Sequence, residues 1–150
     1  MDSNAALLRA LPLHGTARAL AVGAVGCGAG QRCRLWAVRG HRVYGVDTDP
    51  DRIAQARRLA AGLDPAIVFD LARAQALPWP SRSMDLCLVH GSLLSARDWP
   101  ACLAELARVL RPGGALMLHT GSWDDGSGAM ARLGLASGRD SPLAFKHAAN

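Results

Sequence analysis

The sequence contains very little lysine or glutamate. Lys146 is the only lysine and Glu105 the only glutamate, although the net charge is +5. The basic residues are therefore almost all arginines, and they are scattered along the chain, with only Arg57 and Arg58 adjacent. Segments that bind nucleic acid usually concentrate their basic residues, so this scatter argues against a nucleic-acid partner.

Long hydrophobic runs are also missing. Stretches such as 19–25 and 115–118 have the length of a β-strand, well short of the ~20 residues that a membrane-spanning helix needs. Residues 1–12 have no basic cluster followed by a long apolar segment. We therefore expect neither a secretory signal nor a membrane association.

The cysteines form no C-x-x-C pair. They stand alone at Cys27, Cys33, Cys87 and Cys102, and this spacing offers zinc no usual ligand set. We expect no metal site, and we expect reduced thiols that pack as small hydrophobic side chains. Free thiols are typical of the cytoplasm, which is where we expect the chain to act.

Short apolar runs instead alternate with helical patterns. Strands are predicted at 18–25, 42–47, 66–70, 85–90 and 115–120. Helices are predicted at 31–39, 50–61 and 98–110, with Asp49 and Pro50 as a helix start. This alternation predicts an α/β fold, a Rossmann-like three-layer sandwich with a mostly parallel sheet of about five strands.

The chain divides into three predicted parts. Residues 1–17 form an N-terminal helix and loop, and residues 18–120 form the core. Residues 121–150 form a flexible C-terminal segment with room for a short helix at 129–136. The length of 150 residues suits one compact domain, and no internal repeat is visible.

A glycine-rich turn follows the first predicted strand. Gly26, Gly28 and Gly30 occupy alternate positions, and glycine there permits a tight turn and a close approach by a ligand. The second predicted strand ends at Asp47, whose carboxylate can accept hydrogen bonds from ribose hydroxyls. Together these residues predict a nucleoside site. The G-x-G-x-G spacing differs from the G-x-G-x-x-G of dinucleotide enzymes and argues against a nicotinamide dehydrogenase.

Four segments in order resemble the class I S-adenosylmethionine-dependent methyltransferases, especially the small-molecule enzymes of ubiquinone and menaquinone biosynthesis. The segments are 26–30, 40–47, 76–79 and 108–114, and the resemblance extends over about 7–120. It implies S-adenosylmethionine as cofactor and methyl transfer to a small molecule. His90 ends a predicted strand, where open α/β sheets bind their ligands, and is either a candidate catalytic base or a hydrogen-bonded wall residue of the cleft. The implied cofactor contacts are Gly26, Cys27, Gly28, Gly30, Asp47, Thr48, Asp70, Leu71, Val89 and His90.

The chain departs from that family in three places. The family usually has Asp or Glu where this chain has Ala24, to help hold the methionine end of the cofactor. It usually has Asp where this chain has Arg73, to receive the adenine amino group; Asp70 is a nearby substitute. The family sheet has seven strands, and the 30 residues after Thr120 leave little room for the last two. We therefore expect a missing or reduced C-terminal hairpin.

These departures leave alternatives open. A bare fifth strand would invite a homo-oligomer or a partner protein at its edge, unless the C-terminal segment covers it. A second function also remains: a catalytically weak or inactive methyltransferase-like protein that acts as a binding or partner subunit.

The sequence also gives expectations for individual side chains. Trp79 could stack on adenine or on a substrate, or it could cover the core. Leu35, Trp36 and Val38 are expected in the core, whereas His41 is expected in a surface loop. Glu105 and Arg108 have the spacing of a helical surface pair.

Overall fold

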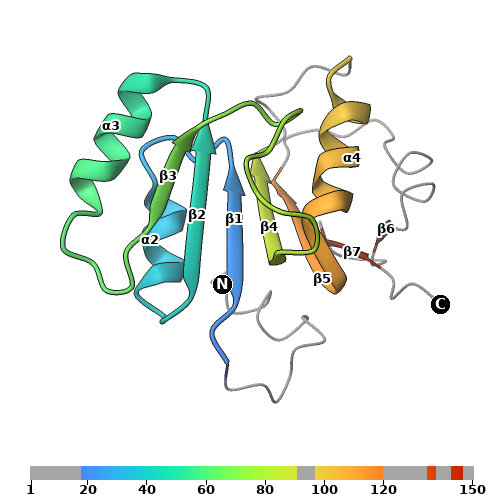
Figure 1. The fold of residues 1–150 in the computed structure, drawn as a ribbon, viewed down its shortest axis with the longest axis horizontal. Helices are drawn as coiled ribbons and strands as arrows, with labels where there is room; N and C mark the ends of the chain where they lie inside the picture. The colour runs from blue at the N-terminus through green and yellow to red at the C-terminus, as the bar shows by residue number, and fades with distance from the viewer. Residues whose placement is uncertain (1–17, 91–96, 120–134, 138–142, 147–150) are drawn as a thin grey trace.

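The computed structural model describes residues 18–90, 97–119, 135–137 and 143–146. The predicted N-terminal helix and loop at 1–17 lie outside the described residues. Within the described residues, seven strands form one sheet in the order β3-β2-β1-β4-β5-β7-β6 (Figure 1). The strands are β1 (Ala21–Val25), β2 (Arg42–Asp47), β3 (Val68–Leu71), β4 (Met84–His90), β5 (Leu110–His119), β6 (Leu135–Ser137) and β7 (Leu143–Lys146).

The first five strands are parallel, as predicted. Their register places Val25, at the end of β1, beside Val46 of β2 and Val89 of β4. Because parallel strands end at the same edge, the residues that follow β1, β2 and β4 meet there. This edge carries the candidate site.

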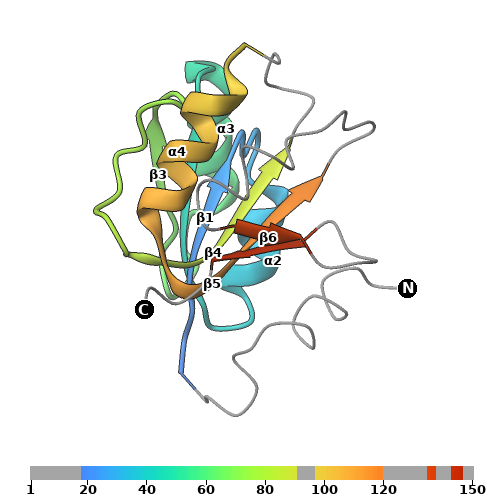
Figure 2. The same ribbon diagram turned by 90° about the vertical axis from the view of Figure 1, so that its right-hand side faces the viewer.

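Three helices of the described part of the chain cover the sheet. They are α2 (Gln31–Ala37), α3 (Pro50–Leu59) and α4 (Trp99–Val109). Figure 2 shows α4 and α2 on opposite sides of the sheet, and each side has its own buried cluster. The predicted three-layer sandwich is therefore confirmed.

Two of the expected core contacts on α2 are wrong. Trp36 is buried, but Leu35 is 40% exposed and Val38 is 67% exposed. Helix α2 has only seven residues, and its buried positions are Cys33, Trp36 and Ala37. This i, i+3, i+4 stripe faces the sheet, so Leu35 is turned away from it.

The start of α3 is confirmed. Asp49 is the N-cap, and its carboxylate accepts from the amides of Asp51 at 2.9 Å and Arg52 at 3.4 Å. Pro50 follows in the first turn, where its missing N–H costs nothing. This cap fixes the turn between β2 and α3, beside Asp47.

The C-terminal hairpin is reduced rather than missing. Strand β7 pairs antiparallel with Ala115–Met117 of β5, and β6 pairs with β7. The chain therefore covers the edge of β5 itself, which was one of the expected outcomes, and removes the reason for a partner at that strand. Residues 135 and 136 lie in a strand, so the helix predicted at 129–136 is wrong there; 129–134 lie outside the described residues.

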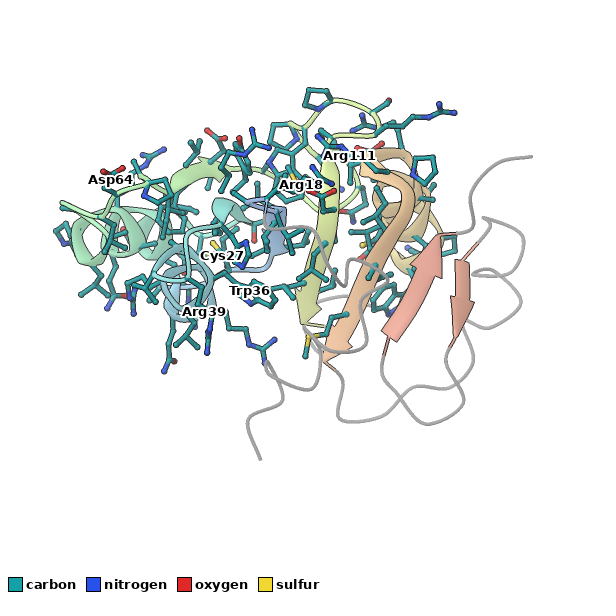
Figure 3. The ribbon with its side chains drawn as sticks, turned by 90° about the horizontal axis from the view of Figure 1, so that it is seen from below. Arg18, Cys27, Trp36, Arg39, Asp64 and Arg111 are labelled. Atoms are coloured by element: carbon teal, nitrogen blue, oxygen red, sulfur yellow. The ribbon has the colours of Figure 1, made fainter. Side chains whose placement is uncertain are left out.

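A buried carboxylate fixes the start of β4. Asp85 is 3% exposed and accepts hydrogen bonds from Arg18 at 2.7 Å, from Arg111 at 3.2 Å and from the amide of Ala21 at 2.9 Å. Arg18 and Arg111 lie close together beside the sheet (Figure 3). A carboxylate at this depth requires such partners. The group ties β1, β4 and β5 together at the end of the sheet opposite the candidate site.

Glu105 and Arg108 do more than the predicted surface pair. Arg108 Nε lies 2.7 Å from Glu105 Oε1, which confirms the pair. Glu105 also accepts from the amide of Leu77 at 2.7 Å, and Arg108 donates to the carbonyl of Trp79 at 2.9 Å. The hydrogen bond that Arg108 donates to Glu105 lowers the pKa of the Glu105 carboxyl. The pair thus fastens the loop before β4 onto α4.

No helix in the described part of the chain is long and apolar enough to cross a bilayer.

Candidate cofactor site

The glycine turn adopts backbone angles that favour glycine. Gly26, Gly28 and Gly30 have φ values of 71°, 55° and 81°, in the left-handed region that disfavours a side chain. Gly30 has a second constraint, because a Cβ there would lie 2.8 Å from Cζ of Phe69. Gly30 is therefore required both by its backbone conformation and by its close packing against Phe69.

The amides of this turn are mostly used within the protein. Those of Gly26 and Cys27 both donate to the carbonyl of Val46 at 2.9 Å, and that of Gly30 donates to Cys27 at 3.0 Å. The amide of Gly28 donates to Asp47 Oδ2 at 2.9 Å. A phosphate-binding loop instead directs its amides at the ligand. This turn therefore fits a nucleoside better than a pyrophosphate.

Asp47 is held in place by two backbone donors. Its Oδ2 accepts from Gly28, and its Oδ1 accepts from the amide of Asp49 at 2.9 Å. Each carboxylate oxygen can accept a further hydrogen bond. Asp47 is therefore both oriented and still able to accept hydrogen bonds from vicinal hydroxyls.

A pocket with a volume of about 220 Å³ lies beside Asp47, and we call it the Asp47 pocket. It carries two carboxylates, Asp47 and Asp98, and one guanidinium, Arg73. Its lining residues are Val25, Gly26, Asp47, Thr48, Ala72, Arg73, Ala74, Gln75, Val89 and Asp98.

Asp98 is a site residue that sequence reasoning missed. It was predicted only as the start of a helix, and it is the N-cap position of α4, without a side-chain capping hydrogen bond. It follows β4, and open α/β sheets bind ligands beyond the ends of their strands. The place of Asp98 after β4 was therefore the sequence signal that could have identified it as a site residue. Asp98 adds a second carboxylate to the lining of the pocket, beside Arg73, which cannot accept a hydrogen bond.

A second pocket, of about 330 Å³, lies across the turn, and we call it the Ala24 pocket. It shares Val25 and Gly26 with the Asp47 pocket, so the two are adjacent. Its described lining carries two arginines and no carboxylate. The lining residues are Ala24, Val25, Gly26, Cys27, Gly28, Ala29, Gln31, Arg32, Arg52 and Leu88.

The structure brings most of the predicted contacts together. Those that line one or both pockets are Gly26, Cys27, Gly28, Asp47, Thr48 and Val89. Leu71 is 57% exposed and lines neither pocket, although it pairs with Asp47 through the strand ladder. His90 ends β4 and pairs with His119 of β5; their side chains lie outside the described residues.

Asp70 is separated from this group. Strand β3 extends to Leu71, so Asp70 lies within the strand, opposite Val46, rather than at its end. It lines a different hollow, with Tyr44 and Trp79. Asp70 therefore does not replace the carboxylate that is missing at Arg73.

Trp79 belongs to the core. It is 5% exposed, and its ring lies against β1 so closely that a Cβ on Gly23 would be 2.6 Å from Cζ3. The alternative in which Trp79 stacks on adenine is wrong.

All four cysteines are free thiols, and Cys33, Cys87 and Cys102 are buried. Burial raises the pKa of Cys87, and it raises the pKa of Cys102 to about 12. A hydrogen bond with Cys27 and burial both raise the pKa of Cys33. These thiols stay protonated, so they are not nucleophiles.

The methyltransferase domain family matches residues 24–118, from β1 to β5. The chain belongs to the methyltransferase domain family. The match confirms the resemblance carried by the four sequence segments, and the fold agrees with it.

Three similar proteins illustrate the family. A malonyl-[acyl-carrier protein] O-methyltransferase from Serratia marcescens is 38% identical over 95 residues, which are 63% of this chain and 36% of that protein. An S-adenosylmethionine-dependent methyltransferase from Mesorhizobium loti has a solved structure with 31% identity and a TM-score of 0.59, covering 67% of this chain and 46% of that one. The [4+2]-cyclase SpnF has 30% identity and a TM-score of 0.60, covering 67% and 38%. This methyltransferase domain thus spans about a third of the length of the Serratia relative.

Proposed function

We propose that the chain binds S-adenosylmethionine and transfers its methyl group to a small-molecule acceptor. The observation that carries this proposal is the double anchoring of Asp47. The amides of Gly28 and Asp49 hold its carboxylate at the edge of a pocket formed where β1, β2 and β4 end.

The residues of the Asp47 pocket suit the adenosine part of the cofactor. Asp47 would accept hydrogen bonds from the ribose hydroxyls. Asp98 would accept one from the adenine amino group, with Ala72 and Ala74 as apolar walls. Gly26, shared by both pockets, would let the chain pass close to the ligand.

When bound, S-adenosylmethionine supplies an activated methyl group on a sulfonium. The protein then acts chiefly by positioning, because holding two reactants together is equivalent to effective molarities of ~10⁵ M or more. A base is needed only for an acceptor that must lose a proton. His90 remains our proposed base by its place at the end of β4.

Similar proteins support a small acceptor. The Serratia relative is named for methyl transfer to malonyl-[acyl-carrier protein], and a relative from Amycolatopsis mediterranei is named for 27-O-demethylrifamycin SV. We propose an oxygen atom of a small or carrier-bound molecule as the acceptor.

The first test is calorimetric titration of the chain with S-adenosylmethionine. We expect a Kd in the micromolar range. Absence of binding at millimolar concentration would reject the proposal. Incubation with the cofactor labelled on its methyl group, together with a panel of small carboxylic acids and alcohols, then tests transfer.

A second function follows from Ala24. Without a carboxylate at this position the cofactor loses a charge-assisted contact, which is worth about 1.5–3 kcal/mol. Binding without transfer to any acceptor would favour the binding or partner subunit. The cyclase in the same structural group illustrates that the fold alone does not fix the activity.

We also propose a cytoplasmic location, supported by four free cysteines. A homo-oligomer or a partner protein remains a proposal as well. Because β7 covers β5, the strand that would mediate it is β6, the last strand of the described sheet. Light scattering at two protein concentrations tests it.

A further inference from the structure

Arg32 is a charged group for which the protein itself provides no counterion in the described part of the chain. It lies in the first turn of α2, is half-buried, and lines the Ala24 pocket. It has neither a hydrogen bond nor an ion pair within the described residues. A guanidinium that is partly removed from water and unpaired favours an anion beside it.

Arg52 adds a second positive charge from another helix. Its Nη1 lies 3.2 Å from the position that a Cβ on Gly28 would occupy, so the guanidinium lies over the glycine turn. Its ion pair with Asp49 is loose, with Nε 3.8 Å from Oδ2 and the arginine side chain 61% exposed. Asp49 also caps α3, so it neutralises Arg52 only in part.

The rest of the described pocket wall offers a cation no carboxylate. Ala24 is 4% exposed and apolar, and Leu88 beside it is also apolar. Asp47, a carboxylate of the site, lines the other pocket. The two ends of the site therefore differ in charge.

We propose that Arg32, assisted by Arg52, binds a carboxylate on the tail of an adenosyl ligand. The chain thus selects its ligand by the carboxylate of the amino-acid end and makes little use of the ammonium group. This inference rests on the proposed function, because it requires an adenosine in the Asp47 pocket. A guanidinium suits this role because its planar donors match both oxygens of a carboxylate.

Four thioether ligands separate the contributions. S-adenosylhomocysteine carries both charged groups, its deaminated analogue carries only the carboxylate, and its decarboxylated analogue carries only the ammonium. Methylthioadenosine carries neither group. Each is titrated calorimetrically into the wild type, Arg32→Gln, Arg52→Gln and the control Arg39→Gln, which makes the same charge change just beyond the end of α2.

In the wild type we expect the two carboxylate-bearing ligands to bind about 10-fold more tightly than methylthioadenosine. The decarboxylated analogue is expected to be the weakest of the four. Arg32→Gln should abolish the advantage of the carboxylate and leave the affinity for methylthioadenosine unchanged. Arg52→Gln should reduce the advantage in part, and Arg39→Gln should leave it intact.

Two results would overturn the inference alone. One is equal affinity of the wild type for methylthioadenosine and S-adenosylhomocysteine. The other is an equal loss for all four ligands in a folded Arg32→Gln variant, since the contribution of Arg32 would then not depend on the carboxylate. If none of the four ligands binds the wild type, the proposed function fails, and this inference fails with it.

Discussion

The two pockets of the site share Val25 and Gly26 but differ in charge. The Asp47 pocket holds two carboxylates and one arginine, whereas the described lining of the Ala24 pocket holds two arginines and no carboxylate. The first pocket has the residues that our proposal assigns to the adenosine. The second has lost the acidic residue that the family usually places at Ala24. The glycine turn thus joins the Asp47 pocket to the Ala24 pocket, which we call the altered half-site because it lacks that acidic residue.

The difference follows from what holds each pocket together. Asp47 accepts hydrogen bonds from Gly28 and Asp49, so it stabilises the turn as well as facing the pocket. A change at Asp47 would therefore damage the fold and the site. Ala24 lies in the middle of the sheet, where an apolar residue packs well without any partner. A carboxylate there serves the ligand alone, so the fold survives its loss.

Gly30→Ala should have the largest effect, because it affects the turn that both pockets share. A left-handed φ and contact with Phe69 together should lower the free energy of unfolding by about 2–4 kcal/mol. Urea unfolding measures the change. Gly40→Ala is the matched control, since Gly40 has a φ of 89° but no atom within 4 Å of a Cβ. Equal losses in both variants would refute the role of Phe69.

Asp47→Ala should damage one pocket strongly. Affinity for methylthioadenosine should fall about 10–100-fold, because charge-assisted hydrogen bonds are worth about 1.5–3 kcal/mol. Calorimetry measures this loss, and circular dichroism checks that the variant is folded. Asp70→Ala is the control and should bind within about twofold of the wild type, a change within the noise of surface substitutions. A comparable loss in Asp70→Ala would contradict the separation of Asp70 from the site.

Ala24→Asp should restore a carboxylate to the Ala24 pocket. The new carboxylate should raise affinity for ligands that carry an ammonium group by about 10-fold, and leave methylthioadenosine unaffected. Some loss of stability is expected because position 24 is buried. Ala24→Asn has a similar shape without the charge and should show no gain. A gain of equal size in Ala24→Asn would rule out a charge effect.

The smallest effect concerns His41, which lies away from both pockets. Its Nδ1 accepts from the amide of Leu20 at 3.1 Å and its ring lies 5.4 Å from that of Trp36, so it is more than the surface residue we expected. Burial, with a contribution from Arg39, lowers its pKa from 6.5. The unfolded chain therefore binds more protons, and stability should decrease slightly as the pH falls below 6.5.

Urea midpoints at pH 7.5 and 5.5 measure that decrease, and His41→Gln separates it from the titration of other groups. Glutamine keeps an acceptor but does not titrate, so the variant should lose part of the pH dependence. An unchanged pH dependence would show that His41 is not responsible. Affinities in both pockets should be the same in this variant as in the wild type.

The sequence was sufficient where a local pattern determines structure. The bounds of β2, the cap at Asp49 and the parallel core were predictable, because turn chemistry and hydrophobic spacing act over a few residues. The glycine turn and Asp47 were predictable for the same reason.

Other features depend on contacts between distant segments. Asp70 was expected in the site because β3 was expected to end one residue earlier than it does. Asp98, Arg32 and Arg52 reach their pockets from three different helices, and no spacing along the chain indicates that convergence. The short β6–β7 pair has too few residues for a hydrophobic pattern, so it could not be distinguished from a loop.

The central claim is that one ligand occupies both pockets, with adenosine beside Asp47 and a carboxylate tail beside Arg32. The most direct test is a titration of ¹⁵N-labelled protein, followed by amide chemical shifts, first with methylthioadenosine and then with S-adenosylhomocysteine. The account predicts that both ligands shift Asp47, Thr48 and the amides of 72–75, and that only S-adenosylhomocysteine also shifts Gln31 and Arg32. Shifts at Arg32 with methylthioadenosine, or none at Asp47 with either ligand, would contradict it.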